Sequence, residues 1–106
     1  MKKFYVVYLT TNLVNGKQYI GDHSTNNLND KYLGSGKIIK DAIKKHGIQN
    51  FKREILEHFE TKQKAFDGQE KYITELNTLV PNGYNISPKG GANCVNGLSK
   101  ESIAQL

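Results

Sequence analysis

The chain has 106 residues, enough for one domain with a modest hydrophobic core that does not depend on disulfides. Its single cysteine excludes an internal disulfide and a zinc site built from several cysteines, and no apolar run approaches the roughly 20 residues of a membrane span. The formal net charge of +5 suits a polyanionic partner, although many basic proteins bind no nucleic acid.

Residues 4–21, FYVVYLTTNLVNGKQYIG, are typical of two short strands joined by a tight turn. The first strand is β-branched and aromatic, as a half-buried strand requires. The pair Asn15-Gly16 is the strongest short hairpin signal, because both residue types tolerate positive φ. The hairpin would bring Tyr8 and Tyr19 to one site on the sheet, unless both are ordinary core tyrosines with paired hydroxyl groups.

A polar loop is expected at residues 22–31, DHSTNNLNDK, which are rich in asparagine and aspartate. Gly34 and Gly36 then allow close approach of a partner, and Ser35 suits the cap of the helix that follows. That helix should run from about Gly36 to His46 and end at the next glycine. One of its faces is apolar, and another carries lysines that would either be solvated or contact phosphates, namely Lys37, Lys40 and Lys44.

Residues 50–58, NFKREILEH, predict a third strand, and Leu56 on its second face predicts burial on both sides. Thr61 suits the cap of a second helix that runs to about Leu76. Gly68 interrupts this helix, where a small residue lets a neighbouring element come close. The buried stripe of the helix is expected to consist of Phe66, Tyr72, Ile73 and Leu76, adjoined by Ala65 and Gln69.

The region after the second helix is expected to be mostly irregular. Asn82-Gly83 predicts a turn, and residues 84–86 predict a short edge strand or an extended segment. Residues 88–93, PKGGAN, have the composition of a flexible linker. A further short helix is expected to start at Ser99, and because the sequence stops inside it, more protein is expected to follow.

Two triplets, Val6–Tyr8 and Tyr19–Gly21, resemble the signature of the GIY-YIG endonuclease family. The second triplet matches in full, whereas the first is VVY rather than GIY. Further stretches resemble the phage and intron homing endonucleases of that family: KHG at 45–47, NF at 50–51, IL at 55–56, ITELN at 73–77 and NGYN at 82–85. The resemblance implies an α+β fold, a small three-stranded antiparallel sheet flanked by helices. It implies a nuclease domain at 1–90, and at 91–106 a linker and the start of a C-terminal DNA-binding region.

For the site, the resemblance implies hydrolysis of a DNA phosphodiester bond. Tyr8 would act as general base or orient the attacking water, and Tyr19 would position the phosphate or the base. A free tyrosine has a pKa near roughly 10, so a nearby cation would have to assist Tyr8. The catalytic arginine of the family has no counterpart after the hairpin, since the only arginine is Arg53. His23 and Lys31 are the cations that would replace it, although a lone loop histidine is more often simply solvated.

The same resemblance implies that DNA binding is mainly electrostatic and falls steeply with salt. Sequence specificity would come chiefly from the C-terminal part. Tyr32 and Ser35 would contact the DNA backbone, and Asn85 would brace the site through hydrogen bonds. The full set of residues expected to serve DNA binding is Tyr32, Ser35, Lys37, Lys40, Lys44 and Asn85.

The family carries a glutamate that binds one divalent cation, Mg²⁺ or Mn²⁺, on the helix before ITELN. Counted back without a gap, this position is Gln69. A carboxamide offers a cation only a neutral carbonyl, so the chain is expected to bind the cation weakly and to cleave slowly, if at all. Three explanations stay open: a deliberate change of Glu to Gln, a natural binder that does not cleave, or Glu70 as the ligand. On a regular helix Glu70 points about 100° away from position 69.

Two alternatives to an enzyme also stay open: a nucleic-acid-binding module that does not cleave, and a small protein-interaction domain. The N-terminus is basic, but its apolar segment ends at Thr10 and is too short to predict a signal peptide. The resemblance implies a protein of a phage or mobile element in the cytoplasm of a bacterial host, with DNA as partner and no membrane. The oligomeric state is left open.

Overall fold

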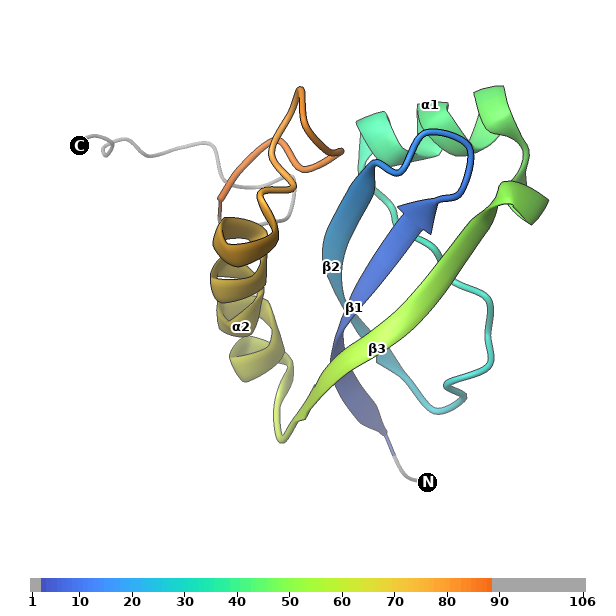
Figure 1. The fold of residues 1–106 in the computed structure, drawn as a ribbon. Helices are drawn as coiled ribbons and strands as arrows, with labels where there is room; N and C mark the ends of the chain where they lie inside the picture. Colours follow the sequence, from blue (N-terminus) through green and yellow to red (C-terminus); the bar gives the residue numbers. More distant parts are fainter. Residues whose placement is uncertain (1–2, 89–106) are drawn as a thin grey trace.

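The computed structural model describes residues 3–88, which form one sheet with a helix on each side (Figure 1). The elements are β1 (Phe4–Asn12), β2 (Gln18–Thr25), α1 (Lys37–His46), the short 3₁₀ helix η1 (Ile48–Asn50), β3 (Phe51–Phe59) and α2 (Lys62–Leu76). The three strands are antiparallel in the order β2-β1-β3, which confirms the expected α+β class. The predicted linker beyond Pro88 and the predicted helix from Ser99 lie outside the described residues.

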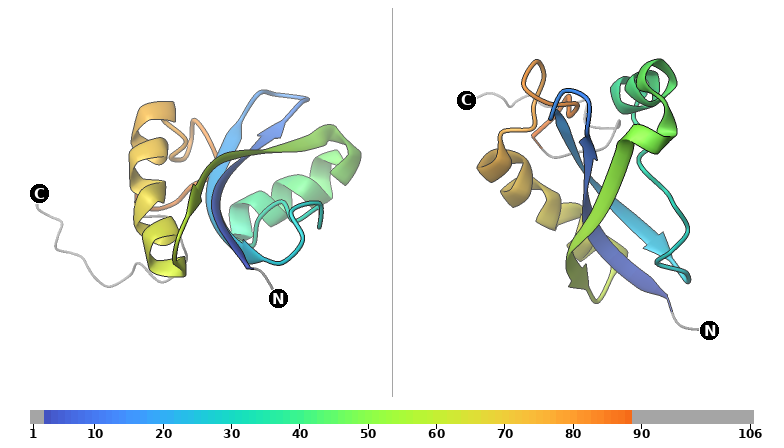
Figure 2. Two further views of the ribbon diagram at one scale, coloured as in Figure 1. Left: turned by 90° about the horizontal axis from the view of Figure 1, so that it is seen from below. Right: turned by 45° about the vertical axis from the view of Figure 1, so that its right-hand side comes forward.

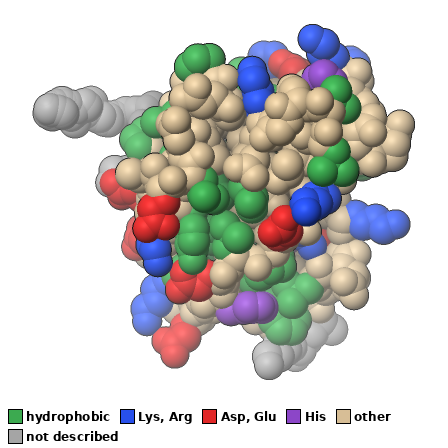
Figure 3. Space-filling view, in the orientation of Figure 1, with side chains coloured by type: hydrophobic (Ala, Val, Ile, Leu, Met, Phe, Trp, Pro, Cys, Tyr) green, Lys and Arg blue, Asp and Glu red, His purple; other side chains and the backbone are tan. Residues whose placement is uncertain are grey.

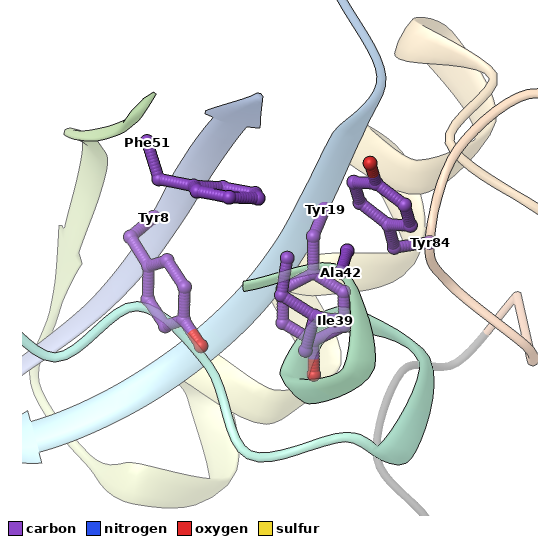
Figure 4. Packing of buried hydrophobic residues seen from close by; sticks show 6 residues of the cluster. All are labelled: Tyr8, Tyr19, Ile39, Ala42, Phe51 and Tyr84. Carbon is purple, nitrogen blue, oxygen red and sulfur yellow. The ribbon is translucent and has the colours of Figure 1, made fainter. Parts of the chain in front are cut away.

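The sheet separates two hydrophobic clusters, because its central strand β1 is buried on both faces (Figure 2). Side chains alternate between the faces of a strand, so Val7 and Leu9 point towards α2 while Tyr8 points towards α1. The cluster on the side of α1 consists of Tyr8, Tyr19, Ile39, Ala42, Phe51 and Tyr84 (Figure 4). The cluster on the side of α2 consists of Val7, Leu9, Ile20 and Ile73.

The hairpin of β1 and β2 is confirmed, but its turn differs from the expected tight one. The two strands are joined by residues 13–17, with positive φ at Gly16 (81°) but not at Asn15. The side chain of Asn12 explains the longer loop, since its Oδ1 accepts a hydrogen bond from the backbone of Val14 (2.8 Å). An Asx turn of this kind competes with the two-residue turn that Asn-Gly favours.

The expected polar loop at residues 22–31 is wrong in its first part, because β2 continues to Thr25. Asp22 pairs with Val7 and Thr25 with Phe4, so the long central strand supplies partners for the polar residues. Backbone pairing therefore overrides the loop preference of these side chains.

Helix α1 begins at Lys37, and the expected cap at Ser35 is wrong. Gly36 is the N-cap, in extended backbone, and no side chain of the described residues caps the helix. At Gly34 the structure shows close packing inside the chain, because a Cβ there would lie 2.9 Å from Tyr19 Cε2. Close approach of a partner to these glycines stays a prediction. The helix ends as predicted at Gly47, whose backbone amide donates to Ile43 (2.9 Å).

Helix α2 is capped as predicted, since Thr61 Oγ1 accepts a hydrogen bond from the Lys64 amide (3.1 Å). Its buried stripe is rotated from the expected one and consists of Ala65, Gln69 and Ile73. Leu76 is 41% exposed, contrary to expectation, because it lies in the last turn, just before the chain leaves the helix. Gly68 does permit close packing, because a Cβ there would collide with the ring of Phe59.

The segment after α2 returns to the free edge of β2. The turn predicted at Asn82-Gly83 is present, with both backbone amides donating to Leu79 (2.9 and 3.0 Å). Asn85 forms an isolated parallel bridge with Leu79, so residues 84–86 form an extended segment rather than a strand. Over residues 3–88, neither helix has the length and apolar character needed to cross a membrane.

Candidate active site

Two tyrosines and one glycine form the centre of the candidate site. Tyr8 lies opposite Gly21 in the register of the hairpin, and a Cβ on Gly21 would collide with the Tyr8 hydroxyl. The glycine of the second triplet therefore makes room for the phenol of the first. The rings of Tyr8 and Tyr19 lie 6.3 Å apart between centroids, and both hydroxyl groups point towards the segment that leads into α1 (Figure 4).

Burial makes both phenols weaker acids than a free tyrosine. Tyr8 is 1% exposed, and burial, the nearby Tyr19 and Tyr32, the charge of Asp22 and a hydrogen bond with Tyr32 raise its pKa far above the usual value. Burial and the neighbouring Tyr32 raise the pKa of Tyr19 to about 12, although a hydrogen bond from the Gly36 backbone opposes the shift. Both hydroxyl groups are therefore protonated at neutral pH.

His23 is held in place on strand β2 beside Tyr8. Its ring is stacked on Tyr32, with centroids 4.0 Å apart and planes inclined by 5°, and meets Tyr8 edge-on. Its Nε2 lies 2.7 Å from Asp30 Oδ2. The interpretation of His23 as a solvated loop histidine is therefore wrong, because it is a strand residue with a stacking partner and a carboxylate.

Asp30 links His23 to Arg53. Burial opposes ionisation of Asp30, but hydrogen bonds from His23, the Tyr32 backbone, Thr25 and Arg53 outweigh it and lower its pKa well below the usual range. The Arg53 guanidinium is 10% exposed, donates to Asp30 Oδ1 (3.0 Å) and the Tyr32 carbonyl (2.8 Å), and also donates to the Leu28 carbonyl. The only arginine thus fixes the loop that carries Tyr32.

Sequence reasoning placed Arg53 on the third strand but missed Asp30 entirely. The available signal was that Arg53 lies on the same face of its strand as Ile55, the residue opposite Tyr8. Lys31, expected like His23 to serve as a catalytic cation, is exposed and has positive φ (63°). Its side chain lines a pocket of about 680 Å³, together with Leu28, Asn29, Leu33, Ile48, Gln49, Phe51, Arg53 and Ile55.

Gln69 lies on the other side of β2, where α2 packs against the sheet. It is 1% exposed, and its Nε2 donates to Asp22 Oδ1 (2.9 Å) and to the Phe66 carbonyl (3.2 Å). Burial raises the pKa of Asp22, although the charges of Lys62 and His23 and its own backbone amide oppose this. Asp22 is a second residue that sequence reasoning missed, and its carboxylate is close enough to act on both tyrosines.

The alternative metal ligand Glu70 is exposed on α2, next to the buried position 69. Among residues 3–88, no three His, Cys, Asp or Glu side chains form a group that could hold a metal ion. The site therefore lies along the edge strand β2, with the tyrosines and His23 on one face and the pair Asp22–Gln69 on the other.

Asn85 braces the site as expected, but it cannot be a DNA contact. Its Oδ1 accepts from the Ile20 amide and from Thr78 Oγ1 (2.8 Å each), and its Nδ2 donates to the Ile20 carbonyl (2.8 Å). The side chain is 2% exposed and its hydrogen-bonding groups are engaged inside the protein. Its grouping with the DNA-binding residues is therefore wrong.

The remaining residues expected to contact DNA are accessible to different degrees. Tyr32 is half-buried, whereas Ser35 and the lysines of α1 are exposed, and Lys37 is paired with Asp41 (2.8 Å). Figure 3 shows basic side chains over the upper part of the molecule, where Figure 1 places α1, and a mixture of acidic and basic side chains over α2.

The site combines a β-hairpin that carries two tyrosines, a glycine that makes room for one of them, and a sheet with a helix on each face. These features together define the class of GIY-YIG domains. The profile described as GIY-YIG catalytic domain matches residues 4–85, and the chain belongs to this family.

Relatives with this domain are known in Enterobacteria phage T4. The chain is 53% identical over 87 residues to the segE protein, a candidate endonuclease by its name, and 40% identical over 89 residues to endonuclease segA. These matches include 82% and 84% of the chain, but only 42% of segE and 40% of segA. The chain thus spans less than half the length of these two relatives.

Among solved structures, the fold is similar to the catalytic domain of the intron endonuclease I-TevI. A point mutant of that domain shares 26% identity, with a TM-score of 0.63 over 80% of this chain and 95% of the other. A second structure of the catalytic domain of the homing endonuclease I-TevI gives 30% identity and a TM-score of 0.55, over 78% of this chain and 98% of the other.

Proposed function

We propose that the chain is the catalytic domain of a DNA endonuclease encoded by a phage or mobile element and acting in the cytoplasm of a bacterial host. The observation that carries this proposal is the Tyr8 hydroxyl packed over Gly21, beside Tyr19, in a member of the GIY-YIG family. The T4 relatives named as endonucleases support it. The reaction is the hydrolysis of a phosphodiester bond by an activated water.

In this reaction the two tyrosines act first as neutral hydrogen-bonding groups. Because both are protonated at neutral pH, Tyr8 orients the attacking water through its hydroxyl, and Tyr19 holds a phosphate oxygen. Tyr8 becomes a general base only when a positive charge nearby lowers its pKa, since burial and the charge of Asp22 act in the opposite direction.

His23 supplies a positive charge or a proton on the tyrosine face. Its Nε2 lies 2.7 Å from Asp30 Oδ2, so the carboxylate is placed to pair with an imidazolium at this position. Arg53 in turn holds Asp30 in position, and stacking on Tyr32 fixes the plane of the ring. We propose that this imidazolium neutralises the phosphate in the transition state, the task that the family gives to an arginine.

DNA is bound mainly through its phosphate backbone. The exposed lysines of α1 lie near the segment that leads to Tyr32 and Ser35, and Lys31 follows Asp30 on the same loop. Contacts of this type are independent of sequence and release counterions, so the affinity falls steeply with added salt. The part of the domain that the structure describes has no long recognition helix, and the sequence has one arginine, so we expect the domain to select its target weakly.

We propose that Mg²⁺ or Mn²⁺ supports the reaction but is bound weakly. Such an ion supplies Lewis acidity at the phosphate and at the leaving oxygen. The residue at the family's ligand position does not fit it, because Gln69 is buried, neutral, and turned with its NH₂ group towards Asp22. We therefore propose that Gln69 makes cleavage by this chain slow.

Gln69 also favours a second candidate function, DNA binding without cleavage. If Gln69 prevents cation binding completely, the domain is a module that binds DNA through the basic face without cleaving it. The loss of one carboxylate removes catalysis and leaves the lysines of α1 unchanged, so DNA binding alone would persist.

The experiment is nicking of supercoiled plasmid in Mg²⁺ or Mn²⁺ by the chain and by Gln69→Glu, each with and without Tyr8→Phe. The endonuclease proposal expects slow nicking by the chain, faster nicking by Gln69→Glu, and loss of nicking with Tyr8→Phe. DNA binding without nicking by any protein would support the module. Absence of DNA binding even at low salt would overturn both.

A further inference from the structure

A pocket of about 680 Å³ adjoins the tyrosine face of the sheet. It lies between the segment that joins β2 to α1, the short helix η1 and the first half of β3 (Figure 1). Phe51, which lines the pocket, belongs to the same hydrophobic cluster as Tyr8, and Ile55 lies opposite Tyr8 in the register of the sheet. The pocket and the tyrosine site therefore share a wall on β3.

The segment at residues 29–33 faces both the pocket and the tyrosine site. Its first, third and fifth residues line the pocket. The two residues between them contact His23: Asp30 Oδ2 lies 2.7 Å from its Nε2, and Tyr32 stacks on its ring. A ligand in the pocket would therefore contact the same short segment that holds His23 in place beside Tyr8.

The lining of the pocket has the chemistry of a nucleotide site. Of the nine described residues that line it, five are apolar, two carry amides, two are cationic and none is acidic. Apolar walls suit the faces of a nucleobase, and the exposed amides of Asn29 and Gln49 can donate to and accept from its edge. Lys31 is exposed and can hold a phosphate as a point charge, whereas Arg53 is already engaged with Asp30. The pocket thus fits a deoxynucleotide, base and phosphate together.

We propose that this pocket takes a single base of the bound DNA, displaced from the duplex, next to the phosphodiester bond at the tyrosine face. A base that is stacked and paired inside a duplex cannot enter a pocket, so it must be extruded or already unpaired. The preferred substrate is therefore DNA with an unpaired or extrahelical nucleotide. The proposal deepens the proposed endonuclease function and rests on it for the identity of the ligand.

The test compares the affinity of the full chain for two short duplexes, without divalent cations, so that neither duplex is cleaved. Both carry the fluorescent adenine analogue 2-aminopurine, which is paired with thymine in one duplex and forms a single-base bulge in the other. We expect the bulged duplex to bind about tenfold more tightly, because its base does not have to be unpaired first. The fluorescence of the bulged base should also rise on binding, as the base leaves its stacked neighbours.

Two substitutions at exposed positions test the pocket itself. Gln49→Ala removes one amide, and Ile48→Ala removes part of the apolar wall at a residue that is 61% exposed. Each should reduce the preference for the bulged duplex by about threefold or more and leave the affinity for the paired duplex unchanged. The matched controls are Gln63→Ala on α2 and Ile86→Ala, at a residue that is 67% exposed. Both lie outside the pocket lining and should retain the full preference.

Three outcomes would overturn the proposal. The first is equal affinity for the two duplexes, and the second is a preference that Gln49→Ala and Ile48→Ala both retain in full. The third is tighter binding of free dAMP than of the bulged duplex, because the pocket would then serve a small nucleotide rather than DNA. Failure of the endonuclease proposal is distinct: the bulged duplex is then preferred in a manner that depends on Gln49, while no variant nicks plasmid DNA.

Discussion

Replacing Gly21 by alanine tests the packing at the centre of the site. The added Cβ would collide with the hydroxyl and Cζ of Tyr8 and lie 2.9 Å from its Cε2. Tyr8 is 1% exposed, so the substitution overpacks a buried site. Overpacking of this kind costs about 1–3 kcal/mol of the free energy of unfolding, and in a domain of this size each kcal/mol lowers the Tm by about 4–8 °C.

The free energy of unfolding is measured by urea titration, with circular dichroism as the signal. Activity is measured as plasmid nicking in proteins that also carry Gln69→Glu. Gly36→Ala is the control, because its added Cβ would come no nearer than 3.4 Å to any neighbour, the nearest being Tyr19 Oη. In a Tyr8→Leu background, Gly21→Ala should cost little, since the shorter side chain vacates the space. A Gly21→Ala protein with the same unfolding midpoint as the chain, or an equal loss in both backgrounds, would refute the reasoning.

Three further predictions concern single side chains. Asn85→Ala removes three buried hydrogen bonds, so we expect a loss of about 2–4 kcal/mol in urea unfolding, and Asn85→Asp should not restore it, because it cannot donate to the Ile20 carbonyl. Asp30 has a folded-state pKa below its unfolded value, so its stabilising effect is present above about pH 4 and is lost as the pH falls through the folded pKa. Asp30→Asn should therefore destabilise the chain at pH 7 and matter less at pH 2, as urea midpoints at the two values would show. Lys40→Ala with Lys44→Ala should weaken DNA binding and reduce the slope of log affinity against log salt by roughly 2, whereas an unchanged slope would exclude α1 from the interface.

The sequence predicts those parts of the fold that depend on neighbours along the chain. The hairpin, the cap at Thr61 and the end of α1 at Gly47 all follow from local signals. The extension of β2 to Thr25 does not follow from local signals. Its polar side chains are typical of a loop, and its pairing partners come from β1. The exposure of Leu76 is likewise decided by where α2 leaves the sheet.

In the candidate site, too, local signals predict some residues, whereas others depend on contacts between distant parts of the chain. Tyr8, Tyr19 and His23 could be found because one hairpin places them close together. Asp22 with Gln69 and Asp30 with Arg53 are separated by 47 and 23 positions, and no local pattern predicts such pairs. Their polar side chains are typical of a solvated loop or helix face in the sequence alone, and only packing reveals their partners.

The side chain of Asn85 has a consequence for the outer edge of the sheet. Among residues 3–88, strand β2 has no neighbouring strand on one side, and such an edge can pair with a second molecule. At Ile20 the amide of Asn85 accepts from the backbone N–H and donates to the backbone C=O, which are the two bonds that an added strand would make. The backbone amide of Tyr84 similarly donates a hydrogen bond to the backbone carbonyl of Gln18 (2.9 Å). Next to Tyr19, this edge of the sheet is therefore closed to pairing with another strand by the Asn85 carboxamide together with the Tyr84 backbone amide.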